Sequence, residues 1–249
     1  MLRKRVIPIL QLNDEKLVKS IKFKSHKYVG DPINAVRIFN EKQVDEIALI
    51  DIAKSKKKED LNYEIIRDIA DECRMPFAYG GGISNINQVE KLFSIGVEKI
   101  ILNTSLLNNY NFINELAKEY GSQSIMVAVD INLNFFSKKK LYSWTKRKNL
   151  KTDVNKHIKN CINYGAGEIL INSVYNEGTL TGFDFSLFDF LDLKVSVPII
   201  LNGGINSVKE INKILKKPEI DAVGIGAMFI YYGPHRAVLI SYISNKERN

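Results

Sequence analysis

The stretch Met75–Asn85, with the sequence MPFAYGGGISN, returns as Val197–Ser207, VPIILNGGINS, at a shift of 122 residues. Three further pairs of segments repeat around it: Glu46–Asp51 with Glu168–Ser173, Lys99–Asn103 with Ala222–Gly226, and more roughly Arg5–Gln11 with Ser124–Asp130. The chain therefore consists of two similar halves, and a feature found in one half has an equivalent place in the other.

Each half contains four short apolar segments, each followed by a stretch with helical patterning. We expect strands at about 5–11, 46–51, 76–80, 99–103, 124–130, 168–173, 198–202 and 221–226. Eight such strand–helix units in 249 residues predict an α/β fold, a (βα)8 or TIM barrel made of two duplicated (βα)4 halves. We expect helices at about 31–43, 59–73, 86–94, 108–120, 152–164, 184–191, 207–216 and 234–245, all within one domain of residues 1–249.

The composition argues against several classes of protein. With 45% apolar residues the chain can bury a large core, but no run approaches the roughly 20 apolar residues of a membrane span. The start of the chain lacks the apolar run of a signal peptide, and Cys73 and Cys161 lack the spacing of a metal site. We therefore expect a cytoplasmic protein with reduced, structural thiols and with neither a metal nor an organic cofactor.

The net charge of +8 raises the question of an anionic partner. The 36 basic residues are scattered among 28 acidic ones, without the aromatic interleaving that is typical of nucleic-acid binding. We expect the short runs Lys56–Lys58 and Lys138–Lys140 to lie in loops. The expected role of this charge is a solvated surface that helps to attract an anionic substrate, with no nucleic-acid or membrane partner.

Two connections between a strand and its helix are unusually long. Residues 12–30 and 131–150 are rich in lysine and follow equivalent strands of the two halves. Their alternating patterns predict hairpins, one of them over residues 135–148. Because long loops commonly carry function, we expect these connections to be mobile covers above the strands that bear Gln11 and Asp130.

Glycines follow three of the expected strands and precede helices. Glycine lets backbone N–H groups approach a ligand oxygen, and a helix N-terminus favours negative charge. Because the halves are duplicated, we expect two phosphate-binding sites on opposite sides of the barrel mouth. The first consists of Gly82, Asn103 and Thr104, and the second of Gly178, Gly204, Gly226 and Ala227. The alternative role for these glycines is to form tight turns only.

Two carboxylates end apolar strands, where packing gives no reason for a charge. Asp130 ends the fifth strand and Asp51 ends the second, so both are candidate catalytic acids or bases. The first strand, which is equivalent to the fifth, ends in Gln11. An amide does not exchange a proton near neutral pH, so a pair of carboxylates at these two equivalent positions is not available.

Four charged residues stand at the opposite, N-terminal ends of strands: Arg5, Glu46, Lys99 and Glu168. Two cations and two anions at one level predict either a ring across the barrel floor or separate, exposed charges. A buried ring is costly unless every charge is paired, so a ring would favour a role in passing a small polar molecule.

Taken together, these features resemble the HisF family, the cyclase subunit of imidazole glycerol phosphate synthase. The similarity covers the whole chain through the motifs KRVIPIL, LIDIA, GGGI, ILNTS, VAVDI, GAGEIL, EGT and NGGI. It implies that a HisH-like glutaminase docks under the barrel and that ammonia passes through it to a phosphorylated small-molecule ligand. The implied residue roles are an ammonia gate of Arg5, Glu46, Lys99 and Glu168, a glutaminase contact at Glu98, and catalytic positions at Lys19 and Asp130.

The sequence departs from this family at the barrel mouth. Gln11 stands where the family has its other catalytic aspartate, and Ile9 replaces a cysteine. Asn202 replaces a serine, and the segment Tyr175–Glu177 replaces Asp-Arg-Asp. This pattern is similar to HisF-like proteins of surface-polysaccharide gene clusters, the WbuZ type. That similarity implies that ammonia is supplied for amidation of a sugar, with an N-sugar amidotransferase as a further partner.

Three hypotheses follow. In the first, the chain is the ammonia-channelling subunit of a glutamine amidotransferase complex for sugar amidation, and its own cyclase activity is doubtful. In the second, it is a genuine cyclase, a lyase of histidine biosynthesis, in which Asp51 or Glu177 takes over the missing proton transfer. In the third, it is a scaffold that only activates the glutaminase.

Overall fold

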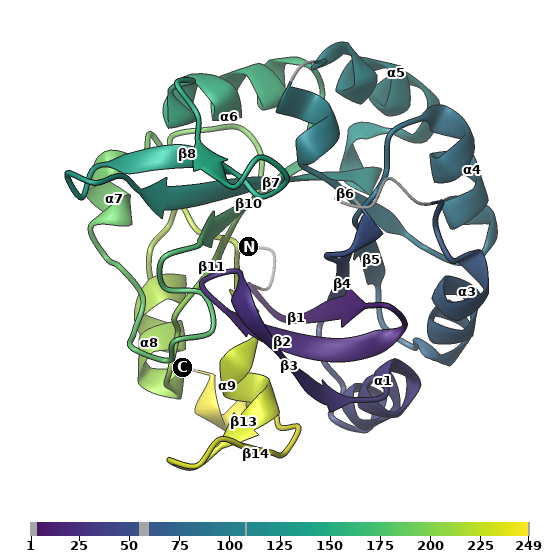
Figure 1. The fold of residues 1–249 in the computed structure, drawn as a ribbon, viewed down its shortest axis with the longest axis vertical. Coiled ribbons are helices and arrows are strands. Elements are labelled where there is room, and N and C mark those ends of the chain that lie inside the picture. Colours follow the sequence, from purple (N-terminus) through teal and green to yellow (C-terminus); the bar gives the residue numbers. More distant parts are fainter. Residues whose placement is uncertain (1–3, 55–59, 108, 249) are drawn as a thin grey trace.

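The apolar segments of the two repeated halves close into one barrel. The computed structural model describes residues 4–54, 60–107 and 109–248. Eight parallel strands form the barrel wall: β1 (Arg5–Asn13), β4 (Ile47–Asp51), β5 (Phe77–Gly80), β6 (Lys99–Leu102), β7 (Ile125–Leu133), β10 (Glu168–Ser173), β11 (Ile199–Asn202) and β12 (Ala222–Ile225). They are paired in this order, and β12 pairs with β1 to close the wall (Figure 1). The predicted (βα)8 barrel is confirmed.

Helices surround this wall: α1 (Pro32–Glu41), α3 (Tyr63–Glu72), α4 (Ile86–Ser94), α5 (Asn111–Tyr120), α6 (Val154–Asn163), α7 (Leu187–Phe190), α8 (Val208–Leu215) and α9 (Ala227–Ile230). Asn85 and Ser207, the last residues of the repeated stretch, accept hydrogen bonds from the third backbone N–H of α4 and α8. Such N-caps satisfy backbone donors that have no partner inside the helix. The duplicated sequence therefore specifies a helix start in addition to a strand.

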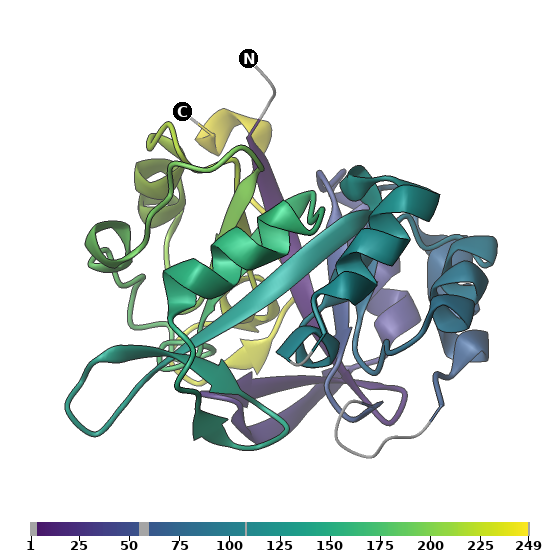
Figure 2. The same cartoon turned by 90° about the horizontal axis from the view of Figure 1, so that it is seen from above.

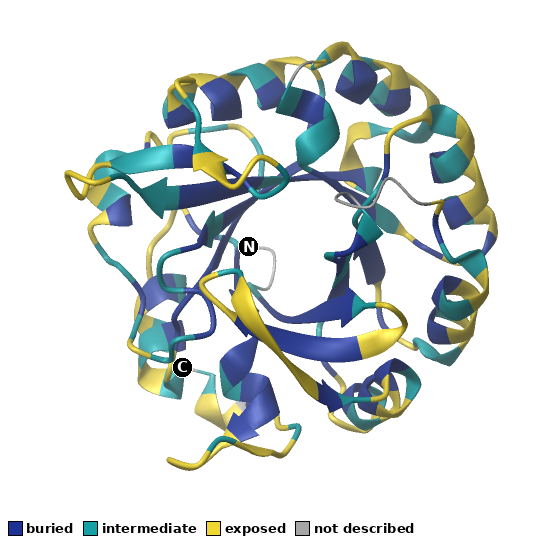
Figure 3. Ribbon diagram, viewed as in Figure 1, coloured by how far each residue is buried: buried dark blue, intermediate teal, exposed yellow. Residues whose placement is uncertain are grey.

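Apolar side chains fill both the barrel and the space between wall and helices. The interior cluster consists of Ile7, Ile9, Ala48, Ala78, Ile101, Met126, Leu170, Ile200 and Ala222. Alternate residues of the same strands face outward into a larger core against the helices, as Val6 and Leu10 do in β1. In Figure 3 the strands are largely buried, whereas the helices are exposed on their outer sides. Burial on both faces explains why the strands are continuous apolar runs.

The two long connections fold back as antiparallel strands onto the barrel strand before them. After β1, the strands β2 (Lys16–Ile21) and β3 (Lys24–Gly30) form a hairpin. After β7, β8 (Lys139–Ser143) pairs with the end of β7, and β9 (Lys148–Asn149) pairs with β8. Hairpins are thus confirmed, but the stretch 135–148 is part of two successive hairpins, because β8 pairs both with the end of β7 before it and with β9 after it.

These hairpins mark one end of the barrel. Figure 2 shows both of them at the same end, while the C-terminal turn η3 (Asn245–Glu247) lies at the other end beside the start of β1. We call the end with the hairpins the mouth and the end where the barrel strands begin the floor. The remaining short turns are η1 (Thr104–Leu107) and η2 (Ser122–Ser124).

The prediction of a helix over residues 234–245 is wrong. After α9, β13 (Tyr231–Tyr232) and β14 (Ala237–Val238) form a hairpin, and the chain then continues without regular secondary structure to η3. Gly233 and Arg236 have φ angles of 69° and 51°, and Pro234 between them has no N–H to donate, so this segment turns instead of continuing as a helix. In place of a final helix, the ring of Tyr242 packs on Phe229 at 5.1 Å between centroids.

Some expectations fall partly outside the described residues, namely the run Lys56–Lys58 and the first residue of each helix predicted at 59–73 and 108–120. The helix expected at 184–191 is a single turn, Leu187–Phe190. None of the described helices has both the length and the apolar character needed to cross a bilayer.

Candidate functional site

A cavity of about 980 Å³, including its part open to solvent, lies at the mouth where the barrel strands end. Residues of both halves line it, among them the candidate catalytic residues Gln11, Asp51 and Asp130. The residues of the first predicted phosphate site, Gly82, Asn103 and Thr104, line it as well. The fold therefore gathers in one place side chains that the sequence identified at separate strand ends.

Asp130 of β7 has only 6% of its surface exposed. Its Oδ2 accepts a hydrogen bond from Asn103 at 2.9 Å, and its Oδ1 accepts one from Asn172 at 3.1 Å. Burial raises the pKa of Asp130 to about 6, although the two amide hydrogen bonds favour the ionised form. A carboxyl group with this pKa can give or take a proton near neutral pH, as general acid–base chemistry requires.

A chain of side-chain amides joins Asp130 to Glu177. Asn202 Nδ2 donates to Asn172 Oδ1 at 2.9 Å and to Glu177 Oε2 at 3.2 Å. Asn172 is in register with Asp130 on one side and with Asn202 on the other, so the three residues share one level of the barrel. Asn172 was not among the predicted site residues, although its position at the end of a strand equivalent to β4 could have indicated it.

Lys19 of β2 forms an ion pair with Glu177. Their side chains are 1% and 4% exposed. The ammonium group lies where a side chain at position 226 would begin, so Gly226 leaves the space that the lysine occupies. The implied catalytic lysine is therefore held by the same carboxylate that was named as a substitute for the missing aspartate.

Gln11 connects β1 to the first hairpin. Its Oε1 accepts hydrogen bonds from the backbone N–H and the hydroxyl of Ser20, each at 3.0 Å. Because the carbonyl is occupied, the group that Gln11 can offer to a ligand is its amide nitrogen, a donor that does not exchange a proton near neutral pH. Gln11 thus holds the first hairpin against the end of β1, and a catalytic role for it stays a prediction.

Asp51 reaches the cavity but also holds the turn that follows β4. Its Oδ1 accepts from the backbone N–H groups of Ala53 at 3.0 Å and Lys54 at 3.3 Å. Burial raises the pKa of Asp51 above its ordinary value. One of its two oxygens is therefore already engaged in local structure.

The two predicted glycine sites occupy equivalent places in the two halves. Gly82 and Gly204 have φ angles of 73° and 83°, a backbone conformation that favours glycine, and each lies ahead of a capped helix. The second set, with Gly178, Gly226 and Ala227, lines a small recess that shares Glu177 and Asn202 with the main cavity. Glu177 lines this recess too, so a carboxylate borders the second site. Binding of phosphate at either site stays a prediction.

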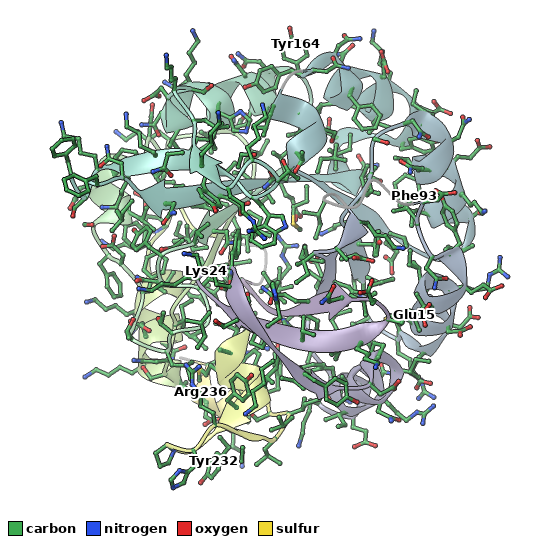
Figure 4. The ribbon with its side chains drawn as sticks, in the orientation of Figure 1. Glu15, Lys24, Phe93, Tyr164, Tyr232 and Arg236 are labelled. Atoms are coloured by element: carbon green, nitrogen blue, oxygen red, sulfur yellow. The ribbon has the colours of Figure 1, made fainter. Side chains whose placement is uncertain are left out.

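Aromatic side chains of the two hairpin systems meet above the cavity. Phe23 packs edge-on against Trp144 with 5.7 Å between ring centroids, and His26 lies 6.1 Å from the same indole. Trp144 Nε1 also donates to the carbonyl of Ile52 at 3.3 Å. Lys24 extends from the turn beside Phe23, at the end of the hairpin opposite to Glu15 (Figure 4). The two covers therefore touch each other here, and their mobility stays a prediction.

The four charged residues of the floor form a closed ring. Arg5 lies 2.5 Å from Glu46 and 3.1 Å from Glu168, and Lys99 lies 3.1 Å and 3.0 Å from the same two carboxylates. Each cation is thus placed between both anions, which is the first of the two arrangements that the sequence left open. Glu98 is exposed next to Lys99 at the same end of the barrel.

Other groups in the described chain give no sign of metal or thiol chemistry. Within residues 4–54, 60–107 and 109–248, no cluster of three or more His, Cys, Asp and Glu side chains could hold a metal ion. Burial raises the pKa of both thiols, Cys73 and Cys161, to about 12, so neither is a thiolate at neutral pH.

A duplicated (βα)8 barrel with paired glycine turns at its mouth and a ring of opposite charges at its floor defines the class of this protein. Its sequence from residue 5 to residue 236 matches the family described as "Histidine biosynthesis protein". The chain belongs to this family.

Named relatives show which members of the family this chain resembles. A Pseudomonas aeruginosa protein, provisionally named imidazole glycerol phosphate synthase subunit hisF2, is 43% identical over 242 residues, which are 97% of this chain and 96% of that protein. A Leptospira borgpetersenii protein, provisionally named subunit HisF, is 40% identical over 255 residues, covering 100% and 98% of the two chains. The imidazole glycerol phosphate synthase subunit HisF of Lactococcus lactis is 34% identical over 232 residues, covering 93% and 90%. The chain is a HisF-like protein.

Proposed function

We propose that this HisF-like chain is the ammonia-conducting subunit of a glutamine amidotransferase complex, and that its ammonia serves the amidation of a surface-polysaccharide sugar. The observation that carries the proposal is the combination of a complete charged ring at the floor with Gln11 at the mouth. The four residues of the ammonia gate are all present at the floor. At the mouth, one of the two expected proton-transferring groups is missing, because Gln11 stands in its place.

The floor supports the passage of a neutral molecule. Two cations and two anions in mutual contact give the ring no net charge. Above it, Ala48, Ala78 and Ala222 contribute small apolar side chains to the interior, where neutral ammonia is favoured over the ammonium ion. A HisH-like glutaminase docked at this end, with Glu98 among its contacts, would release ammonia directly into the ring.

The mouth supports ligand binding more clearly than ring-closing chemistry. Asp130 is suited to exchange a proton, but Gln11 across the cavity is only a donor. A reaction that needs an acid and a base at these two places therefore lacks one of them. In this proposal the phosphorylated ligand at the mouth belongs to an amidation reaction, and an N-sugar amidotransferase receives the ammonia.

The second candidate function is that of a genuine cyclase of histidine biosynthesis. The raised pKa of Asp130 and the two equivalent glycine sites favour it. However, the substitute groups are already engaged, since Asp51 holds a turn and Glu177 is paired with Lys19. Before either carboxylate could serve as the second acid or base of a cyclase, a bound ligand would have to displace the contact that this carboxylate makes.

Complementation separates the two candidates. The chain is expressed in a histidine auxotroph that lacks only its cyclase subunit, and a bona fide HisF serves as the positive control. We expect no growth without histidine. Growth at the rate of the control would overturn the sugar-amidation proposal and establish the cyclase.

A binding experiment tests the conducting role independently. The chain is mixed with its HisH-like glutaminase and glutamine, and the mixture is analysed by size-exclusion chromatography. We expect a heterodimer, since stable interfaces of this kind bury on the order of 1,600 Å². With the N-sugar amidotransferase added, a Lys99→Glu variant, which gives the ring three anions and one cation, should abolish amidation that depends on glutamine, while amidation with free ammonium salt continues. Absence of any complex would contradict the proposal.

A further inference from the structure

The positive charge of this protein is concentrated in the two connections that form the mouth hairpins. Residues 12–30 hold five lysines and two acids, whereas residues 131–151 hold six lysines and one arginine with no acid at all. Their joint net charge of +10 exceeds the +8 of the whole chain, so the rest of the molecule is slightly acidic. Charge that looks scattered along the sequence is therefore gathered by the fold at one end of the barrel.

Most of these basic side chains are exposed. They include Lys22, Lys24 and Lys27 on the first hairpin and Lys138, Lys146, Arg147, Lys148 and Lys151 on the second system. Both systems lie at the mouth end of the barrel (Figure 2). A broad, basic end of this kind attracts anionic surfaces over about a Debye length, roughly 8–10 Å in physiological salt.

The turn between β7 and β8 carries two exposed phenylalanines. Phe135 is 96% exposed and Phe136 is 75% exposed, and their rings contact each other edge to face with 5.4 Å between centroids. Lys138 follows within the same turn, and a hollow behind the turn is lined by Lys138, Lys139 and Lys140 together with Asp153. Figure 2 shows this hairpin reaching sideways beyond the barrel wall. Because these two rings lie in water on a projecting turn, they do not contribute to the buried core, and folding does not explain why both side chains are apolar.

We propose that the mouth end of this protein docks onto an anionic lipid surface, with Phe135 and Phe136 inserted among the headgroups and the lysines of both hairpin systems on the lipid phosphates. Interfacial binding of this kind combines a buried apolar element with electrostatic attraction to anionic lipids. A lipid surface accommodates a convex apolar tip without a preformed pocket, which a protein partner would have to provide. Nucleic acid would use aromatic rings as stacking platforms for successive bases, whereas these two rings stand at 88° to one another and do not form a common platform.

This inference goes beyond the proposed function and does not depend on which acceptor receives ammonia. It differs from the expectation of no membrane partner, which rested on the absence of a spanning segment and on apparently dispersed charge. Docking of this kind would place the cavity opening close to the bilayer.

Co-sedimentation with vesicles tests the proposal on the full chain. Vesicles of phosphatidylcholine alone are compared with vesicles containing about 30% phosphatidylglycerol, at about 0.1 M and about 0.5 M salt. We expect at least about tenfold stronger partitioning onto the anionic vesicles at the lower salt, and a loss of about fivefold or more in the Phe135→Ser/Phe136→Ser variant. The matched control is Tyr164→Ser, because Tyr164 is 40% exposed at the C-terminal end of α6, ahead of the start of β10 and away from the mouth (Figure 4), and its partitioning should be unchanged.

Insertion itself is read from fluorescence. In a Trp144→Phe background, which removes the single tryptophan, Phe135→Trp provides a probe at the tip. We expect its emission to shift to the blue on anionic vesicles and to be quenched by brominated lipid. Equal partitioning onto neutral and anionic vesicles, or a Phe variant that binds as the native protein does, would overturn the proposal. Retention on heparin without any vesicle binding would assign this surface to a polyanionic or acidic macromolecule and overturn it as well.

Discussion

Lys19 and Glu177 form a buried ion pair between the first hairpin and the loop that follows β10, with side chains 1% and 4% exposed. A charge pair removed from water stabilises a fold only while both partners are present, because either charge alone would be left without its solvation. The pair therefore joins the first hairpin, which belongs to one half of the barrel, to a mouth loop of the other half. Its loss should be felt far more than the loss of a surface pair.

We expect Lys19→Met to lower the free energy of unfolding by about 3–5 kcal/mol, because it leaves the carboxylate of Glu177 buried without its cation. The matched control is Lys159→Met, which breaks the solvent-exposed pair with Asp192, with side chains 58% and 43% exposed, and should leave the free energy of unfolding almost unchanged. The double variant Lys19→Met/Glu177→Leu should be more stable than Lys19→Met alone. Urea unfolding of the variants measures these differences. Equal costs for Lys19→Met and Lys159→Met would contradict the role of the buried pair.

The stability of the protein should depend on the ionisation of Asp130. Its pKa of about 6 in the folded state lies above the ordinary value of 3.8, so the folded form binds the proton more tightly than the unfolded chain does. Ionisation therefore costs stability progressively as the pH rises from about 4 to about 6, and the full cost is present above that range.

Asp130→Asn removes this cost but also one hydrogen bond at every pH, so the informative quantity is the change with pH. We take the free energy of unfolding of the variant relative to that of the native protein. This difference should be higher at pH ~8 than at pH ~4, by about 2–3 kcal/mol. Asp68→Asn on the exposed side of α3 should show no such trend. A pH-independent difference between Asp130→Asn and the native protein would refute the raised pKa.

Gln11 should limit any cyclase activity. With the phosphorylated ribulosyl precursor and free ammonium salt, we expect native turnover about 10²–10⁴-fold below that of an ordinary cyclase, because one proton-transferring group is absent. Gln11→Asp should restore part of it. Gln11→Asn has the same length as the aspartate but no carboxylate, and should restore nothing. Native turnover at the level of an ordinary cyclase would sink this prediction, and inactivity of Gln11→Asp would mean that Ile9, Tyr175 and Asn202 have reshaped the pocket as well.

The contact between the two mouth covers can be followed through the single tryptophan of the chain. Phe23→Ala removes the ring that packs on Trp144, so we expect the indole emission to shift to the red and its quenching by acrylamide to increase. Phe93→Ala, which removes a ring packed on Tyr120 at the outside of the barrel, should leave the emission unchanged. If both variants behaved like the native protein, the packing of Phe23 on Trp144 would not hold the covers together in solution.

Much of this molecule follows from local patterns in the sequence. The repeated strand–glycine–cap pattern predicted the barrel, and the charges at strand starts predicted the members of the floor ring, because residues that begin parallel strands lie at one level. The failure at residues 234–245 has a local cause, since Gly233 and Pro234 turn the chain ahead of a segment with an otherwise helix-compatible pattern.

The contacts between distant segments could not be predicted. The bond from Asn202 to Glu177 and the packing of Phe23 on Trp144 depend on side-chain conformations and on how far each hairpin bends over the mouth. Neither has a signature in sequence spacing. The role of Gln11 toward Ser20 was hidden for the same reason, because it requires β2 to fold back onto β1.

The segment that follows β14 has a practical consequence for experiments on this protein. Tyr242 donates its hydroxyl to the carbonyl of Val6 at 2.8 Å, and Arg248 pairs with Asp45 at 2.7 Å, so the end of the described chain is anchored beside the starts of β1 and β4. An affinity tag fused to the C-terminus would therefore emerge next to the charged ring, in the space where we propose that a glutaminase docks. A weak complex measured with a tagged chain would report on the tag, and proteolytic removal of the tag before mixing restores the native surface.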